Sequence, residues 1–258
     1  MKIVTAFFMA WGYFLALPCP YKKWDEHQRH YMLGFLPAVG IVAGALWCVW
    51  SLFLQYIGLP IYIESIATLT FIFFISGFFH LDGFMDTCDA LLSRRDMAER
   101  QRILKDSTVG AFSVISVVLL IAWWIVIFVI SLKRAPLWGL FLIPVISRTM
   151  SAIWVLTLKP IGHSQYRDGF TRAQRKNALI MTVFLAIAGI VIAMIIAALS
   201  GAAFYLPVVL TIGMVIASGA CIVHATGQLG GMSGDISGFS LCMSELLGIL
   251  IVALLIQF

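Results

Sequence analysis

Residues 178–223 read ALIMTVFLAIAGIVIAMIIAALSGAAFYLPVVLTIGMVIASGACIV and contain no Asp, Glu, Lys or Arg. A helix needs about 20 apolar residues to cross a bilayer, so this uncharged run of 46 residues has room for two spans. We expect the break between them at Ser200-Gly201, because glycine readily ends a helix. The stretch predicts a membrane protein built from apolar helices.

The rest of the chain has the same character. Of its 258 residues, 62% are hydrophobic and 11% are charged, whereas a soluble domain carries about 25% charged residues. We therefore expect one all-α domain over residues 1–258, a polytopic integral membrane helical bundle of six to seven transmembrane helices. Further spans are expected at about 34–57, 62–80, 111–132, 137–158 and 238–257.

The apolar residues 3–18 are too few for a comfortable span and lack a small-x-small cleavage site. They are predicted to form a re-entrant or interfacial segment that stays in the protein. Five cysteines, with no CxxC pair among them, indicate neither a disulfide framework nor a thiolate zinc site.

Charge fixes the expected orientation. With seven spans, four polar segments share one side of the membrane: 21–30, 80–110, 159–177 and 225–237. Three of the four are strongly basic, and the opposite side carries charge only at Lys133-Arg134. The positive-inside rule predicts that these loops face the cytoplasm, in a multi-pass protein of the cytoplasmic (inner) membrane. The net charge of +5 is modest and indicates basic cytoplasmic loops rather than binding of nucleic acid. The apolar spans predict the lipid bilayer as the partner.

The most unusual segment is HLDGFMDTCD, residues 80–89. Asp82, Asp86 and Asp89 are spaced i, i+4 and i+7, which places them on one face of a helix. Three like charges repel one another unless a cation lies among them. Mg²⁺ prefers carboxylate oxygens as ligands and usually binds water and substrate phosphates as well. These residues are predicted to hold one or two divalent ions that act on a phosphoryl group. A solvated acidic helix is the structural alternative.

Other polar residues fall on the same predicted side. Lys105, Arg94 and Arg95 are candidates for neutralising phosphate oxygens, although the orientation rule also accounts for the arginines. Asp106 is a candidate to join the aspartate face. The segment 230–238, GGMSGDISG, is dense in glycine, which lets the backbone approach an anion closely. Its residues Gly230, Gly231, Gly234 and Asp235 are candidate substrate contacts, with an N-cap as the structural alternative for Asp235.

Arg148 and Glu245 are ionisable residues that lie inside apolar segments. Such residues are costly in a membrane and usually functional. Arg148 needs Asp82, Glu245 or a substrate phosphate as its partner, and these alternatives stay open. His80 is a candidate ligand, acid/base or structural hydrogen-bonding group.

HLDGFMDTCDALLSRR followed by KDSTVGAF resembles the signature of the cobalamin synthase family (adenosylcobinamide-GDP ribazoletransferase), and GGMSGDISG resembles its C-terminal segment. The resemblance covers nearly the whole chain. It implies Mg²⁺-dependent transfer of the cobinamide-phosphoryl group of adenosylcobinamide-GDP to α-ribazole or its 5′-phosphate, with release of GMP.

On this resemblance Asp82, Asp86 and Asp89 hold the metal. Lys105 and Asp106 complete the catalytic group, with Asp106 or Asp235 as the proton acceptor. Substrate contacts are expected from His80, Arg94, Arg95, Arg148, Gly230, Gly231, Gly234, Asp235 and Glu245. The chain departs from the family pattern at Ala90, Gln228, Ser233 and Cys242.

The sequence leaves two alternative functions. A CDP-alcohol phosphotransferase would show a DG-xx-AR run ahead of G-xxx-D-xxx-D, and this chain lacks the Ala-Arg pair. A cation or proton transporter would place several carboxylates at mid-membrane, whereas here they cluster at one face. The sequence is compatible with a monomer or a homo-oligomer.

Overall fold

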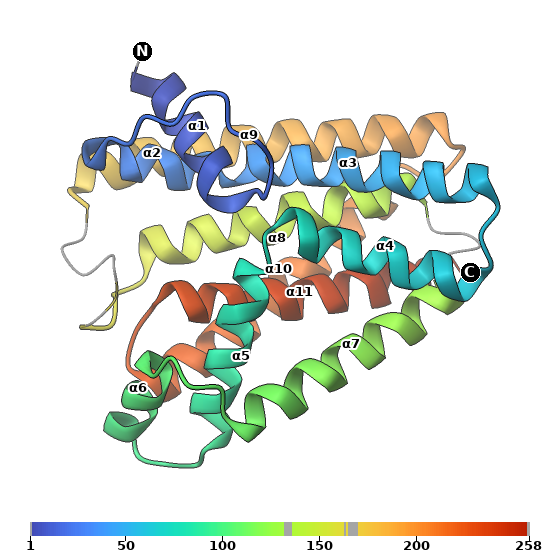
Figure 1. Ribbon diagram of the computed structural model, residues 1–258. Helices are drawn as coiled ribbons and strands as arrows, with labels where there is room; N and C mark the ends of the chain where they lie inside the picture. The colour runs from blue at the N-terminus through green and yellow to red at the C-terminus, as the bar shows by residue number, and fades with distance from the viewer. Residues whose placement is uncertain (1, 132–135, 163, 165–169, 257–258) are drawn as a thin grey trace.

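The computed structural model describes residues 2–131, 136–162, 164 and 170–256, and within them every regular element is a helix (Figure 1). The expected all-α fold is confirmed. The α-helices are α1 (Lys2–Phe14), α2 (Arg29–Gly34), α3 (Leu36–Ile57), α4 (Ile61–Ile75), α5 (Phe79–Leu92), α6 (Met97–Lys105), α7 (Ala111–Ser131), α8 (Leu137–Thr157), α9 (Arg172–Leu199), α10 (Leu206–Leu229) and α11 (Gly234–Leu255), with a 3₁₀ turn η1 (Glu26–Gln28) before α2. The predicted basic turn at Lys133-Arg134 and part of the predicted loop 159–177 lie outside the described residues.

Six of the described helices are long and apolar enough to cross a membrane: α3, α7, α8, α9, α10 and α11. Helices α4 and α5 form a pair bent by 90°, which makes seven spans if the pair is taken as one. The prediction of six to seven spans is confirmed. Helix α1 is apolar but short, and its interfacial or re-entrant location stays a prediction.

Helix α8 forms the centre of the bundle, with 83% of its apolar stretch buried. In Figure 1 it runs between α3 on one side and α10 and α11 on the other. Gly40 and Gly44 of α3 let the two backbones meet, because a Cβ at either position would lie about 2.5 Å from a carbonyl oxygen of α8. Small residues at i and i+4 are a common means of close helix packing in membranes.

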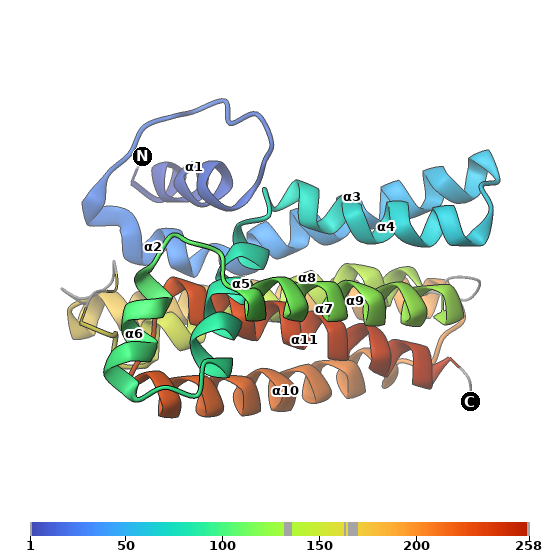
Figure 2. The same cartoon turned by 60° about the horizontal axis from the view of Figure 1, so that its bottom comes forward.

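The prediction of one continuous apolar segment over residues 62–80 is wrong, because the chain turns by 90° before the aspartates. Helix α4 ends at Ile75, and α5 begins at Phe79. Gly77 and Phe78 both have left-handed backbones, with φ of 61° and 59°; glycine adopts this conformation without steric cost and commonly ends a helix with it. The turn carries α5 across one end of the long helices, outside the six spans (Figure 2).

The polar loop predicted at 225–237 is also shorter than expected. Helix α10 continues to Leu229 and α11 begins at Gly234, so only residues 230–233 connect them. Gly230 ends α10 in the left-handed conformation, with φ of 79°. The N-cap of α11 is Ser233, whose Oγ accepts a hydrogen bond from the N–H of Ile236 at 3.3 Å. Asp235 therefore lies inside the first turn of α11 and is not its cap.

Candidate active site

Helix α5 is amphipathic, with its aspartates on the outward face. Asp82 is exposed and Asp86 and Asp89 are half-buried, while Leu81 and Phe84 are buried on the other side of the helix. The predicted shared face is therefore present. None of the three carboxylates forms an ion pair with a basic residue in the part of the chain that the structure describes.

A fourth carboxylate comes from α11. A Cβ added to Gly83 would lie 2.8 Å from the Cα of Asp235, so the first turn of α11 packs directly on α5. Burial, together with the charges of Asp82, Asp235 and Asp89, raises the pKa of Asp86 to about 6. The structure thus gathers negative charge from two helices at one end of the bundle.

The KDS segment reaches the same place through the loop between α6 and α7. Gly110 lies against the carboxylate of Asp89 so closely that any Cβ there would overlap it. Asp106, at the end of α6, accepts hydrogen bonds from the backbone N–H of Thr108 at 3.0 Å and from its hydroxyl at 2.8 Å. These bonds lower the pKa of Asp106. Asp106 and Lys105 are exposed.

The glycine segment is held by two neighbours, a feature that the sequence did not reveal. From α6, the side-chain amide of Gln101 donates to the carbonyl oxygen of Leu229 at 2.7 Å. From the other side, the N–H of Ile161 donates to the carbonyl of Met232 at 2.9 Å, and the N–H of Met232 donates to the carbonyl of Lys159 at 2.8 Å. Gly231 lies beside this bridge, and a Cβ added to it would be 3.0 Å from the carbonyl oxygen of Lys159. In this structure the glycines permit close packing of protein segments, and their role in substrate binding stays a prediction.

Arg148 and Glu245 pair with each other in the core. Their side chains are 1% and 2% exposed, and they form the buried ion pair between α8 and α11. The hydroxyl of Ser147 donates to Glu245 at 2.8 Å, and Arg148 also donates to Ser76 Oγ at 3.0 Å. Of the partners left open for Arg148, the structure selects Glu245. Contact of either residue with substrate stays a prediction, and both side chains face the interior.

The remaining predicted residues lie near the two ends of α5. His80, at its start, is buried with its ring stacked on Phe14, and its Nε2 has no hydrogen-bond partner among the described residues. Its neighbour Gly234 shares a small cavity with it. Arg94 and Arg95 lie in the exposed turn after α5, and neither forms an ion pair with a described residue.

The departures from the family pattern have structural roles. Gln228 accepts a hydrogen bond from Arg100 of α6. Cys242 is fully buried, and its thiol donates to the carbonyl of His80 at 3.4 Å. Ala90 is also fully buried, and Ser233 is the helix cap described above. Gln228 thereby links α10 to α6, and Cys242 links α11 to α5.

Carboxylate oxygens are the donors that Mg²⁺ prefers, so the chemistry of this end fits the ion. The described residues nevertheless contain no group of three His, Cys, Asp or Glu side chains that converge closely enough to hold a metal by themselves. Mg²⁺ usually takes one or two carboxylates and completes its shell with water and substrate phosphates. The arrangement fits that mode and not a closed protein cage.

The model of the family described as cobalamin-5-phosphate synthase matches residues 6–253. The chain belongs to this family. It is 35% identical to an adenosylcobinamide-GDP ribazoletransferase of Clostridium botulinum (strain Alaska E43 / Type E3), over 93% of this chain and 94% of that one. It is 35% identical to the enzyme of the same name from Clostridium perfringens (strain SM101 / Type A), over 99% and 100%. No solved structure matches. The protein is thus a membrane-embedded transferase of cobalamin biosynthesis.

Proposed function

We propose that this member of the cobalamin synthase family joins adenosylcobinamide-GDP to α-ribazole or its 5′-phosphate and releases GMP. A ribose hydroxyl attacks the cobinamide-bound phosphorus, the bond from that phosphorus to the GMP oxygen breaks, and the hydroxyl proton passes to a base. Both clostridial relatives are named adenosylcobinamide-GDP ribazoletransferase, which supports this proposal. The observation that supports it most in this chain is the cluster of Asp82, Asp86, Asp89 and Asp235 beside the KDS loop.

Such a cluster is unfavourable in the protein alone. Like charges at these spacings repel, and Asp86 is moreover half-buried. We infer that Asp82, Asp86 and Asp89 share between them one or two Mg²⁺ ions, which they would hold together with the pyrophosphate of the substrate. The bound ion would neutralise charge on the phosphoryl oxygens and on the leaving GMP.

The residues around α5 have complementary roles in this proposal. Arg94 and Arg95, before α6, and Lys105, its last residue, are exposed cations suited to binding phosphate oxygens. Asp235 is the better candidate for the base, since its backbone packs against Gly83 of α5 and its charge acts on Asp86. Asp106 is less suited, because its carboxylate already accepts two hydrogen bonds from Thr108 and a lowered pKa makes it a weaker proton acceptor.

The family match over residues 6–253 favours this reading over a CDP-alcohol phosphotransferase. A transporter is disfavoured because Arg148 and Glu245, buried between α8 and α11, are paired with each other. We also propose that the end of the bundle with α5 and α6 faces the cytoplasm, where nucleotide substrates are available.

The test is an assay of purified protein in lipid nanodiscs with Mg²⁺, adenosylcobinamide-GDP and α-ribazole. GMP should form at the same rate as the cobalamin product, and omission of α-ribazole should abolish both. Parallel reactions with α-ribazole 5′-phosphate identify the preferred acceptor. If folded protein released no GMP with either acceptor, the proposal would be rejected.

A further inference from the structure

The first turns of α9 carry an unusual concentration of positive charge. Arg172, Arg175 and Lys176 are spaced i, i+3 and i+4 and therefore share one side of the helix. The first turn contains no acidic residue. The N-terminus of a helix already bears a partial positive charge of about half an elementary charge. Three cations are thus placed where the helix dipole disfavours them.

These cations have no ion-pair partner among the described residues. The helix end itself is well formed, because Thr171 and Gln174 make a reciprocal capping box with bonds of 3.2 and 2.9 Å. The charge is therefore displayed on an ordered helix end. An anion bound here would reduce both the repulsion among the three cations and their unfavourable interaction with the helix dipole.

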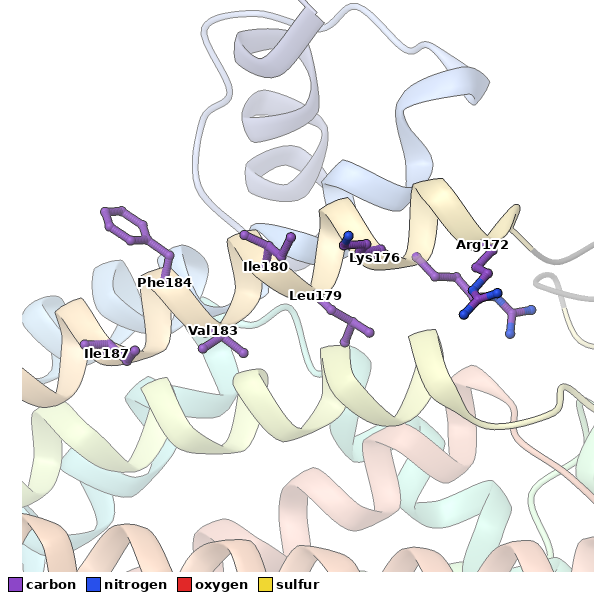
Figure 3. Close-up of a pocket in the computed structure, with 8 residues that line it drawn as sticks. Arg172, Lys176, Leu179, Ile180, Val183, Phe184 and Ile187 are labelled. Carbon is purple, nitrogen blue, oxygen red and sulfur yellow. The ribbon is translucent and has the colours of Figure 1, made fainter.

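The same side of α9 continues as an apolar groove. Leu179, Val183 and Ile187 follow the basic residues at helical spacing, with Ile180 and Phe184 beside them. Figure 3 shows Arg172 at one end of the row and Ile187 at the other. The groove is a shallow, open one lined by residues of α9 alone, with a volume of about 670 Å³. It is charged at one end and apolar along the rest of its length.

The dimensions of the groove fit one leaflet. Lys176 and Ile187 are eleven residues apart in the sequence, which corresponds to about 16 Å of helix at about 1.5 Å per residue. Half the hydrocarbon core of a bilayer is about 15 Å thick. An acyl chain that starts at the basic end would therefore run along the apolar row to the middle of the membrane.

We propose that this side of α9 binds one anionic phospholipid. Its phosphate contacts Arg172, Arg175 and Lys176, and an acyl chain lies along Leu179, Val183 and Ile187. The orientation rule explains basic residues on this side of the membrane, but it requires neither their common face nor the groove beneath them. A zwitterionic headgroup fits less well, because it would bring its own positive charge to a site that has three.

The site connects to the rest of the fold through α2. Asn177 donates to the hydroxyl of Tyr31 at 3.5 Å, and a Cβ at Gly34 would lie 3.1 Å from the carbonyl oxygen of Ala178. A lipid held on one side of α9 would therefore steady the contact of α9 with α2 on the other. The expected effect is a higher temperature of unfolding, independent of any catalytic activity.

The experiment measures the unfolding temperature of the full chain in a neutral detergent with added phosphatidylglycerol or phosphatidylcholine. Phosphatidylglycerol should raise it by a few degrees more than phosphatidylcholine does, since a ligand that binds only the folded state stabilises it. The variant Arg172→Gln/Arg175→Gln/Lys176→Gln should lose this difference. The control Lys22→Gln/Lys23→Gln, which removes exposed charge before α2, should keep it.

Two further arms separate headgroup from chain. Glycerol 3-phosphate supplies the anion without acyl chains and should not stabilise the protein. Val183→Trp should fill the groove, leave the cations in place and weaken the phosphatidylglycerol effect. Native mass spectrometry of the folded variants should show at least tenfold less bound phosphatidylglycerol for the triple variant. Equal stabilisation of wild type and triple variant, or full stabilisation by glycerol 3-phosphate, would overturn the proposal.

Discussion

Arg148 is 1% exposed, and its guanidinium is held by Glu245 and by the hydroxyls of Ser147 and Ser76. Burial of a single ion costs several kcal/mol, which a close partner and further hydrogen bonds can offset. The sequence showed that both ions were costly in an apolar helix. Their pairing was one of three alternatives, because 97 residues separate them and only the register of α8 against α11 brings them together.

Removal of one member of this pair should therefore be more harmful than removal of both. Glu245→Leu should lower the free energy of unfolding by about 3–5 kcal/mol, because it leaves a buried positive charge unpaired. Arg148→Met combined with Glu245→Leu should recover most of that loss. The measurement is a double-mutant cycle of denaturant unfolding in detergent. Additive single and double effects would show that the two side chains are not coupled.

At the scale of elements, the contact between α5 and α11 brings the site together. It depends on Gly83, beside Asp235, and on Gly238, where a Cβ would lie 2.8 Å from the carbonyl of His80. The sequence predicted the aspartate face of α5 correctly. It did not predict the turn at Ser76–Phe78, since the apolar run continues through it, nor the early start of α11. The turn depends on the left-handed backbones of Gly77 and Phe78, and the start of α11 on the Ser233 cap, neither of which the hydrophobic pattern indicates.

Gly83→Ala tests this contact. The added methyl group would force α5 and α11 apart, at a cost of about 1–3 kcal/mol for overpacking. The variant should still fold, but its rate of GMP release should fall strongly. The matched control is Gly227→Ala near the end of α10, where a Cβ meets no atom within 4 Å. It should retain full activity. Wild-type turnover by Gly83→Ala would mean that close approach of these helices is not required.

For the whole molecule, the arrangement of spans predicts that the site-bearing end faces the cytoplasm. Ser107 lies in the exposed loop after α6, and Ser200 lies at the exposed end of α9. In a background with the five cysteines replaced by alanine, Ser107→Cys should react with a membrane-impermeant maleimide only in inside-out vesicles. Ser200→Cys should react in right-side-out spheroplasts. The reverse pattern would contradict the positive-inside assignment.

The central claim is that the aspartates of α5 hold the ion on which phosphoryl transfer depends. Its most direct test is Mg²⁺-dependent GMP release by Asp86→Asn, with Glu99→Gln of α6 as the control, because Glu99 instead pairs with Arg102 at 2.7 Å. We predict a loss of about 100-fold or more for Asp86→Asn, the size expected when a group that stabilises transition-state charge is removed. Thermal stability without metal should be equal or higher, since one of four neighbouring like charges is gone. Near wild-type turnover of Asp86→Asn with unchanged Mg²⁺ dependence would contradict the claim.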